Sequence, residues 1–508
     1  MGMRPFSALA LASTLTMPVA EIVSQEGLTL AAPLNSTETY LVDRDGNVAH
    51  QWSSDYLPGL AAEIDSQGRL WRAIDPGNNQ WSGRPGSGGG IERFAWDGSL
   101  EWQAFISDNT WLQHHDIEVL PNGNVLAIVW ENRTVAEAVA AGRDAAITTD
   151  GIFAPDMIVE IRPEGPDGGT VVWEWRVWDH LIQDTDQAKP NFGTISDHPE
   201  LIDINYPPKN ARAGDWTHFN SVDYDPVNDL ILISCKHFDE VWVIDHATTK
   251  AEAAGAKGDL LYRWGNPAAY QRGSAAEQQL FGQHDAQWIA AGLPGAGDIL
   301  VFNNGQQRPA GNWSSVEQFS PPVDANGSFT NPGAGAWGPQ APNWSWADGS
   351  FFSALAGGCQ RLANGNTFIT DSGHGRVFEV DHAGSVVWFW DNPFPNQTDN
   401  TLFRSSNEDR MLWPGNTALS LAGGLLKFEV IAGAHHANQR YAMTGGINGL
   451  PMTQFKLWYS LDQHGRGLHN LLVPPLSSAL LGRTARLFAF TASRPRIYSK
   501  ELTVKFIP

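Results

Sequence analysis

The sequence is poor in charged residues, and the charge that it carries is mainly of one sign. Asp, Glu, Lys and Arg make up 17% of the 508 residues, against about 25% in an average domain. The 33 basic and 55 acidic residues give a formal net charge of −22. A chain this acidic lacks the basic surface that binds nucleic acid or an anionic membrane, so neither is expected as a partner.

Long apolar runs and cysteines are also scarce. No run approaches the ~18 apolar residues of a membrane-spanning helix, so no span is expected. The two cysteines, Cys235 and Cys359, lie in apolar, strand-like sequence, and their spacing is not that of zinc ligands. We expect free, buried thiols, with a disulfide between them as the less favoured alternative.

The first residues have the features of an export signal. A short basic start at 1–4 precedes the apolar segment "PFSALALASTL", and "PVA" ends in a small residue. We therefore expect residues 1–24 to be a signal peptide or leader, and the protein to be secreted or periplasmic. A leader without a signal function is the alternative.

Glycine, proline and tryptophan, by contrast, are abundant, with 51, 31 and 22 residues. A strand, a glycine turn and a second strand rich in Val and Trp recur at 42–52, 64–74, 94–105, 119–131, 361–372 and 380–393. Asn-Gly or Asp-Gly between two strands is a strong hairpin signal, because both turn residues are expected to have positive φ. The repeats predict an all-β fold of successive blades, a β-propeller, with a large β-sandwich as the alternative.

The pattern also divides the chain. Two Ala-rich connections, 134–148 and 246–258, predict short helices, and 324–350 predicts a long irregular insertion. The repeats place a propeller at 25–395, followed by a linker at 396–410. Strand-like segments in 411–508 predict a small C-terminal β-sandwich with an accessory role.

Polar residues interrupt the apolar pattern in four motifs, three of which stand where a predicted strand begins, while Lys236 follows the predicted strand "LILIS". They are His114 and His115 in "QHHD", His218 and Asn220 in "WTHFN", Lys236 in "SCKH" and His284 in "QHDA". In a propeller the inner strands of all blades begin around one channel, so residues distant in sequence can converge there.

Two chemistries fit such a ring of histidines. Neutral imidazoles can bind a metal ion, with Asp116 and Asp285 orienting the rings. Alternatively, one imidazole is a nucleophile and the others transfer protons. Lys236 and Asn220 favour the second chemistry, because a cation and an amide suit an anionic oxygen better than a metal.

Several motifs occur together and in order, among them "WTHFNSVDYDP", "DLLYRWGNP", "QHDAQWI", "DILVFNNG", "FFSALAGGCQRLANGNTFIT" and "GRVFEVDHAGSVVWFWDNP". Over residues 27–395 the chain thereby resembles the bacterial arylsulfotransferases that do not use a nucleotide sulfate donor. The resemblance implies a six-bladed β-propeller. It also implies ping-pong transfer of a sulfuryl group from an aryl sulfate to a phenol through a sulfohistidine, with no metal or other cofactor.

The resemblance further implies a role for each residue of the ring. His284 is the expected nucleophile, His218 the proton-transferring group, and Lys236, Asn220 and His115 the residues that hold the sulfuryl oxygens. His114 is the alternative to His115. Lys236 stands where the family has Arg, which keeps the charge but loses the planar fork of a guanidinium.

Trp216 and Phe219 are the expected stacking partners of the aryl ring. The expected partners are therefore a small aryl sulfate and a phenol, and the sequence leaves open whether the chain is a monomer or a homodimer. Two other functions remain as alternatives, because fold alone does not define function. One is a secreted propeller that only binds its ligand, and the other is a metal-dependent hydrolase or lyase that uses the histidine ring.

Overall fold

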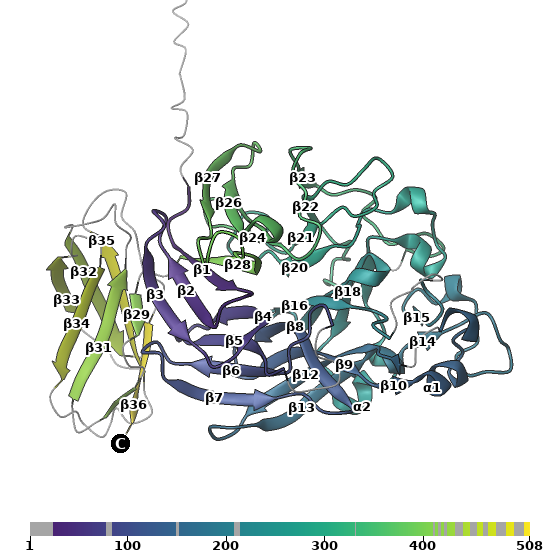
Figure 1. Cartoon of the computed structure of the whole chain (residues 1–508), viewed down its shortest axis with the longest axis horizontal. Coiled ribbons are helices and arrows are strands. Elements are labelled where there is room, and N and C mark those ends of the chain that lie inside the picture. The colour runs from purple at the N-terminus through teal and green to yellow at the C-terminus, as the bar shows by residue number, and fades with distance from the viewer. Residues whose placement is uncertain are drawn as a thin grey trace, which may run out of the picture.

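The computed structural model of the protein consists almost entirely of β-strands (Figure 1). It describes residues 24–77, 84–148, 152–207, 214–330 and 332–409, and strands within 412–507. Residues 1–23 lie outside the described residues, so the export signal stays a prediction. Among the described residues, no helix is long and apolar enough to cross a membrane.

Six four-stranded antiparallel sheets within residues 24–409 form the blades of a propeller, which confirms the expected all-β fold. From the inner strand outward, blade 1 contains β28 (Leu402–Glu408), β1 (Leu28–Pro33), β2 (Glu38–Val42) and β3 (Val48–Ser53). Blade 2 contains β4 (Leu57–Ile64), β5 (Leu70–Asp75), β6 (Gly90–Phe94) and β7 (Leu100–Phe105). Blade 3 contains β8 (Trp111–Val119), β9 (Val125–Glu131), β12 (Asp156–Pro163) and β13 (Gly169–Arg176). Blade 4 contains β16 (Phe219–Asp225), β17 (Leu230–Cys235), β18 (Glu240–Asp245) and β19 (Tyr262–Trp264). Blade 5 contains β20 (His284–Trp288), β21 (Ile299–Asn303), β22 (Ser315–Phe319) and β23 (Trp344–Trp346). Blade 6 contains β24 (Gly358–Arg361), β25 (Thr367–Asp371), β26 (Arg376–Val380) and β27 (Val386–Asp391).

The connections between the strands contain short helices. Both expected helical connections are present, as α1 (Val135–Ala140) and α2 (Lys250–Ala253), and each begins with a capping box. Two short strand pairs join β10 (Arg133–Thr134) to β11 (Ile152–Phe153) and β14 (Leu181–Ile182) to β15 (Ile202–Asp203). The 3-10 turns are η1 (Ala145–Ile147), η2 (Val177–Asp179), η3 (Ile195–Asp197), η4 (Lys236–Phe238), η5 (Ala256–Gly258), η6 (Pro267–Tyr270), η7 (Ala275–Glu277) and η8 (Ser372–His374).

The C-terminal strands form two further sheets, as expected of a small sandwich. One contains β29 (Leu412–Pro414), β31 (Gly424–Ile431) and β34 (Arg466–Val473). The other contains β30 (Ala418–Ser420), β36 (Leu502–Ile507), β35 (Thr484–Thr491), β32 (Arg440–Ile447) and β33 (Phe455–Ser460).

The glycine turns adopt a different geometry from the one expected. In the β2–β3 hairpin, Gly46 has a φ of 85° and donates its N–H to the carbonyl of Asp43 at 3.0 Å, while Asp45 keeps a negative φ. Gly123 makes the same bond to Leu120, at 2.9 Å. The turns are thus three-residue loops with a bulge at glycine, in which one residue rather than two needs a positive φ.

Tryptophan side chains link each blade to the next by hydrogen bonds. In every blade, an indole N–H from the fourth strand donates to a backbone carbonyl between the third and fourth strands of the next blade, at 2.6–3.0 Å. The six pairs are Trp52 with Ala95, Trp102 with Gly168, Trp175 with Gly258, Trp264 with Pro339, Trp346 with Gly384 and Trp388 with Arg44. The last pair joins blade 6 to blade 1, so the recurring Trp of the sequence repeats serves ring closure.

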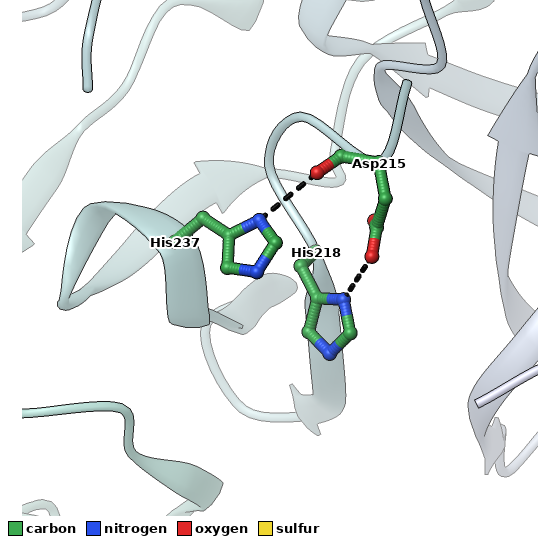
Figure 2. A group of neighbouring side chains, drawn as sticks. All are labelled: Asp215, His218 and His237. Atoms are coloured by element: carbon green, nitrogen blue, oxygen red, sulfur yellow. Dashed lines mark hydrogen bonds and ion pairs between the residues drawn. The ribbon is translucent and has the colours of Figure 1, made fainter. Parts of the chain in front are cut away.

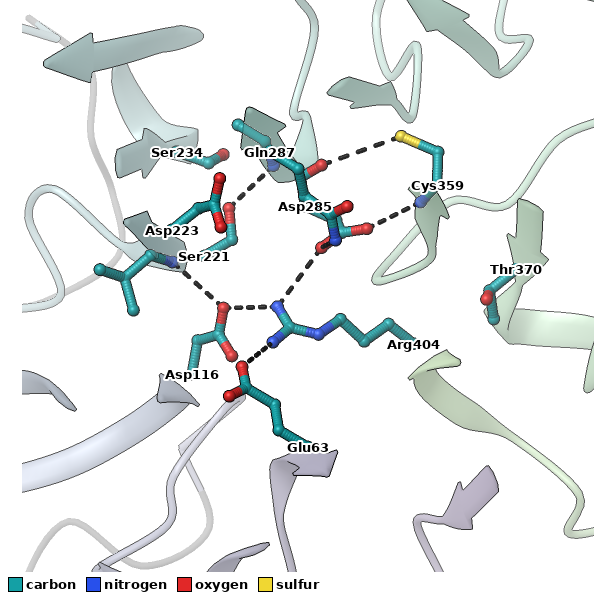
Figure 3. Close-up of polar contacts among 12 residues, drawn as sticks. Glu63, Asp116, Ser221, Asp223, Ser234, Asp285, Gln287, Cys359, Thr370 and Arg404 are labelled. Carbon is teal, nitrogen blue, oxygen red and sulfur yellow. Dashed lines mark hydrogen bonds and ion pairs between the residues drawn. The ribbon is translucent and has the colours of Figure 1, made fainter. Parts of the chain in front are cut away.

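The segment 402–408, which the sequence placed in a linker, is the inner strand of blade 1. It pairs with β1 and so closes the ring with a strand from the far end of the propeller. Its sequence, "LFRSSNE", is polar because Arg404 points into the channel. Arg404 forms ion pairs with Asp116 at 2.5 Å, Glu63 at 3.1 Å and Asp285 at 3.3 Å (Figure 3).

The carboxylates around Arg404 also join neighbouring inner strands, because each accepts a backbone N–H from the next blade. Glu63 accepts from Val119, Asp116 from Val222, Asp223 from Trp288 and Asp285 from Cys359, at 2.5–3.1 Å. A cavity of about 520 Å³ lies in the channel against this layer, and Glu118 also lines it. This layer is acidic, because Arg404 is surrounded by five carboxyl groups, those of Glu63, Asp116, Glu118, Asp223 and Asp285. We call it the acidic floor of the channel.

Gly358 is required for this arrangement. A Cβ at this position would meet the carboxylate of Asp285 and lie 3.0 Å from the Cβ of Arg404. Gly358→Ala should therefore lower the free energy of unfolding in urea by about 1–3 kcal/mol. Gly373→Ala in the same blade is the control, since a Cβ there meets nothing within 4 Å. Equal stability of the two variants would contradict the role given to Arg404.

The acidic floor should make stability depend on pH. Burial raises the pKa of Glu63 to about 8, of Asp223 to about 7 and of Asp116 to about 6. These groups keep protons in the folded protein at pH values where the unfolded chain has lost them, so their stabilisation is complete below about pH 4 and is lost as the pH rises through about 6 to 8.

Urea denaturation should therefore give a lower free energy of unfolding at about pH 8.5 than at about pH 5.5 for the wild-type protein. These two pH values lie just above and just below the pKa values of the three carboxyl groups. Asp223→Asn should reduce that difference, because the amide does not ionise. The exposed Asp399→Asn is the control and should leave the difference unchanged. An Asp223→Asn variant with the wild-type pH dependence would show that this carboxyl does not titrate as described.

Candidate active site

The histidines stand at irregular points of three successive inner strands. His115 on β8 and His218 just before β16 have φ of 52°, and Asp285, which follows His284 on β20, has φ of 51°. In each strand the pairing register with the neighbouring strand shifts at this place. A bulge with a left-handed residue redirects a side chain, and such strained residues are common at functional sites. The bulges thus bring the three imidazoles together above the layer of Arg404.

His284 is backed by an amide. Its side chain is buried, and Nδ1 lies 2.7 Å from Oδ1 of Asn304, directly after β21. The Nδ2 group of Asn304 donates to the carbonyls of Ser353 at 2.8 Å and Ala356 at 2.7 Å, which fixes Oδ1 as the acceptor facing the ring. His284 therefore carries its proton on Nδ1, and Nε2 has the free lone pair.

His218 is backed by a carboxylate. Its Nδ1 bonds to Oδ2 of Asp215, three residues earlier in the chain (Figure 2). His237 stacks on His218 with ring centroids 4.6 Å apart, and its Nδ1 donates to the backbone carbonyl of Asp215 at 2.9 Å. The carboxylate and the carbonyl of one residue thus orient two imidazoles.

His115, rather than His114, is the histidine next to the other imidazoles. Its ring centroid is 4.6 Å from that of His218. Gly86 lies directly against it, since a Cβ on Gly86 would overlap the ring, and the N–H of His115 donates to the carbonyl of Gly86 at 2.9 Å. His114 is fully buried behind it, stacked on Trp130 at 4.0 Å. The structure thereby decides between the two histidines, and it removes His114 from the residues expected to bind substrate.

Lys236 and Asn220 lie at the same end of the channel. Lys236 opens η4, is buried, and donates its backbone N–H to the carbonyl of His218 at 3.2 Å. Asn220 is fully buried on β16, and its Nδ2 donates to the carbonyl of Gln283 at 2.7 Å. Lys236 brings a cation to this end of the channel and Asn220 an amide.

Burial keeps the imidazoles neutral. It lowers the pKa of His218 to about 3, although Asp215 opposes this, and it lowers the pKa of His115 and of His284 well below the usual value. Lys236 adds to all three shifts through its positive charge. Burial alone would raise the pKa of Asp215, but the bond to His218 lowers it overall, so this carboxylate is ionised. Neutral imidazoles can act as nucleophile or base.

Two sequence-based expectations about neighbouring residues need correction. Asp116 and Asp285 do not orient the imidazoles, because their carboxylates point to Arg404. Trp216 and Phe219 do not stand in the channel. Trp216 packs on Phe153 and bonds through its indole N–H to the carbonyl of Tyr206, and Phe219 packs against tryptophans of blades 3 and 4. Both side chains belong to the hydrophobic core.

The aromatic residue next to the histidines is Phe403 on β28. Its ring centroid lies 6.1 Å from that of His115 and 6.5 Å from that of His284. Sequence reasoning missed it, because its segment carries no blade pattern. It also missed Asn304 and Asp215 as partners of histidines, although Asn304 lies in the motif "DILVFNNG" and Asp215 directly precedes "WTHFN".

The residues that could bind a metal ion are not the ring of histidines expected from the sequence. Among the described residues, Asp215, His218 and His237 form the group whose ligand atoms lie within 4.8 Å of one another (Figure 2). Two imidazoles and a carboxylate suit several divalent metals. The neighbouring Lys236 does not, because its charge opposes that of a metal ion.

Comparison with solved structures finds similar chains at low sequence identity. A Bacteroides caccae protein of unknown function is 12% identical over 75% of this chain and 98% of its own, with a TM-score of 0.41. Virginiamycin B lyase from Staphylococcus aureus is 10% identical over 72% and 82%, with a TM-score of 0.34. The periplasmic gluconolactonase PpgL of Pseudomonas aeruginosa is 12% identical over 95% and 99%, with a TM-score of 0.36. A search of curated proteins finds no match.

A family of sequences matches much more specifically. The sequence model of the arylsulfotransferase (ASST) family matches residues 23–321. This range covers more than half of the chain and includes His115, His218, Lys236 and His284. The chain belongs to the arylsulfotransferase family.

Proposed function

We propose that this protein transfers a sulfuryl group from an aryl sulfate to a phenol in two steps, through a sulfohistidine at His284. Membership of the arylsulfotransferase family supports the general activity. The assignment of the nucleophile rests on one observation, namely that His284 is backed by a neutral amide whereas His218 is backed by a carboxylate.

This difference in backing separates the two roles. A carboxylate beside Nδ1 stabilises an imidazolium, so His218 is suited to take up and release a proton. An amide orients the ring without adding negative charge, so His284 stays neutral with the lone pair of Nε2 available. Burial strengthens this, since it lowers the pKa of His284 well below the usual value.

In the first step, Nε2 of His284 attacks the sulfur of the aryl sulfate, and the bond from sulfur to the phenolic oxygen breaks. The bond from Nδ1 to Asn304 is retained in the sulfohistidine. In the second step, an acceptor phenol gives its proton to a neutral imidazole such as His218. Its oxygen then attacks sulfur, and the bond from nitrogen to sulfur breaks. The proton taken from the acceptor protonates the phenolate that departs in the next cycle.

The positive charge at the site suits the sulfuryl oxygens. Sulfuryl transfer resembles phosphoryl transfer in having a loose transition state, so positioning and charge contribute most of the rate. Lys236 supplies the charge, and Asn220, whose Nδ2 donates to the carbonyl of Gln283, has a second amide N–H for a sulfuryl oxygen. Phe403, which stands between His115 and His284, offers an aromatic surface for the aryl ring.

The direct test is the covalent intermediate. Protein mixed with 4-nitrophenyl sulfate and no acceptor, then quenched in alkali, should carry one sulfuryl group on the peptide that contains "FGQHDAQW", detected by mass spectrometry. His284→Asn should abolish the adduct and lower turnover with a phenol by at least about 10³-fold, as removal of a nucleophile does. Asn keeps a polar side chain of similar size at this position. An adduct on His218 or His115, or normal turnover in His284→Asn, would refute the assignment.

A metal-dependent reaction is the second candidate, and the group of Asp215, His218 and His237 is the observation that favours it. Under our proposal, exhaustive chelation leaves aryl sulfate turnover unchanged, because His284 and Lys236 need no metal. Activity that disappears on chelation and returns with one added metal would establish the second candidate instead. Metal analysis of the purified protein, before and after chelation, is the control for complete removal.

A further inference from the structure

We propose that Asp156, His114 and His115 form a proton relay, which makes His115 a second acid–base residue of the transfer reaction. This inference rests on the proposed function and extends it. The resemblance to the family implied that His115 holds sulfuryl oxygens as a hydrogen-bond donor. The hydrogen bonds behind it indicate that it accepts a proton instead.

The three residues form a buried chain of hydrogen bonds. Nδ1 of His115 lies 2.7 Å from Nδ1 of His114, and Nε2 of His114 lies 2.7 Å from Oδ1 of Asp156 on β12. Asp156 and His114 are fully buried, and His115 is 4% exposed. With His114 stacked on Trp130, the order from the channel inward is imidazole, imidazole, carboxylate.

The donors around Asp156 fix the direction of this chain. Its Oδ2 accepts the hydroxyl of Thr217 at 2.5 Å and the backbone N–H of Phe219 at 2.9 Å. Burial raises the pKa of Asp156, but the bonds from His114 and Thr217 oppose that rise, and a carboxylate with three donors is stable as an anion. Oδ1 therefore accepts a proton from Nε2 of His114.

The positions of the remaining protons follow from the chemistry of a neutral imidazole, which has one donor and one acceptor nitrogen. His114 donates from Nε2, so its Nδ1 accepts. His115 must then donate from Nδ1, which leaves a lone pair on its Nε2. In this state His115 has no proton to offer a sulfuryl oxygen. Its open nitrogen is an acceptor.

The same chain stabilises His115 when it gains a proton. The imidazolium formed at Nε2 would keep its bond from Nδ1 to His114, and the bond from His114 to Asp156 places a negative charge behind it. Without this support, the neighbouring His218, His284 and Lys236 disfavour a positive charge here, and with burial they lower the pKa of His115. The bond from Nδ1 to His114 fixes the orientation of the ring, against which Gly86 packs.

The step that the relay serves is transfer to the acceptor. The O–H proton of the phenol moves to Nε2 of His115 while its oxygen forms a bond to sulfur, and the bond from sulfur to Nε2 of His284 breaks. His115 then carries an additional proton on Nε2, which it gives to the phenolate released in the next cycle. The ring centroids of His115 and His218 lie 4.6 Å apart. On this proposal, two bases with a carboxylate behind them lie close together, and the nucleophile His284 has an amide behind it.

Asp156→Asn tests the relay without changing the size of the side chain. Its oxygen can still accept from Thr217 and Phe219, which places the Nδ2 group against Nε2 of His114. His114 must then accept there and donate from Nδ1, and His115 must carry its proton on Nε2. The substitution should thus reverse both tautomers and convert His115 from an acceptor to a donor, as expected for an Asp-to-Asn change behind a catalytic histidine.

The tautomers are measured by ¹⁵N NMR on protein labelled at histidine, with His115→Gln used to identify the signal of His115. The proton of His115 should be on Nδ1 in the wild-type protein and on Nε2 in Asp156→Asn. A wild-type His115 with its proton on Nε2 would overturn the proposal. This measurement does not depend on activity, so it decides the relay even if the protein is not a sulfotransferase.

The two half-reactions give a kinetic test. In Asp156→Asn, release of 4-nitrophenolate from its sulfate should slow by less than about tenfold, because this leaving group needs no proton. Transfer from the sulfoenzyme to unactivated phenol should slow by about 10²–10⁴, the usual contribution of a general base. Equal slowing of both half-reactions, or none, would overturn the proposal. Failure of the wild-type protein to form the adduct would instead refute the proposed function.

A control for folding accompanies the kinetics. His246→Gln changes a histidine bonded to Asp229 and Glu160, and it should slow neither half-reaction. Thermal unfolding should show that Asp156→Asn is folded. If it is not, His115→Gln takes its place, because an amide at position 115 can donate to a sulfuryl oxygen but cannot accept a proton. A His115→Gln variant that transfers to phenol at the wild-type rate would show that His115 only holds oxygens.

Discussion

The ion pairs of Arg404 are the interaction on which the channel depends. Arg404 comes from the strand that closes the ring, and its guanidinium reaches carboxylates on β4, β8 and β20. Removing one partner of a buried ion pair typically costs about 3–5 kcal/mol, because it leaves the other charge uncompensated. Here one cation faces several carboxyl groups, each of which also accepts a backbone N–H from the next blade. The position of every inner strand, and hence of every histidine, is tied to this layer.

Above that layer, the three histidines differ in what lies behind them rather than in what they face. His284 has an amide behind it, His218 a carboxylate, and His115 a second histidine followed by a carboxylate. The imidazole is the same in each case, so the backing group determines where its proton sits and whether a positive charge is tolerated. The differences between the three imidazoles therefore come from the groups behind them.

The sequence predicted the part of this architecture that repeats. Glycine turns and tryptophans recur along the propeller because the hairpins need a residue with a positive φ and each joint between blades uses an indole hydrogen bond. The inner strand β28 has no such pattern, since it faces polar groups of the channel, and it was therefore taken for a linker. Of the site, His115, His218 and His284 carry a recognisable motif. Asn304 lies in the motif "DILVFNNG" and Asp156 lies in none, but the sequence shows the histidine partner of neither, because residues 20 or 42 positions apart meet only once the strands pair. Trp216 and Phe219 were misplaced because the sequence does not show which way the side chains around His218 turn, and both pack into the core.

The closing strand has a consequence for the order in which the protein can become active during synthesis. β1 is made near the start of the chain, but its partner β28 follows about 370 residues later. Until then β1 is an unpaired edge, the channel lacks Arg404 and Phe403, and the inner strands have no common ion pair. Formation of contacts this distant in the chain is slow, because a long loop must be closed first. A nascent or truncated chain that ends before residue 402 would contain five complete blades and all three histidines of the site, yet it would lack both Arg404 and Phe403. The ring is thus completed, and the three imidazoles of the channel are held in place by Arg404, only after nearly the whole propeller has been made.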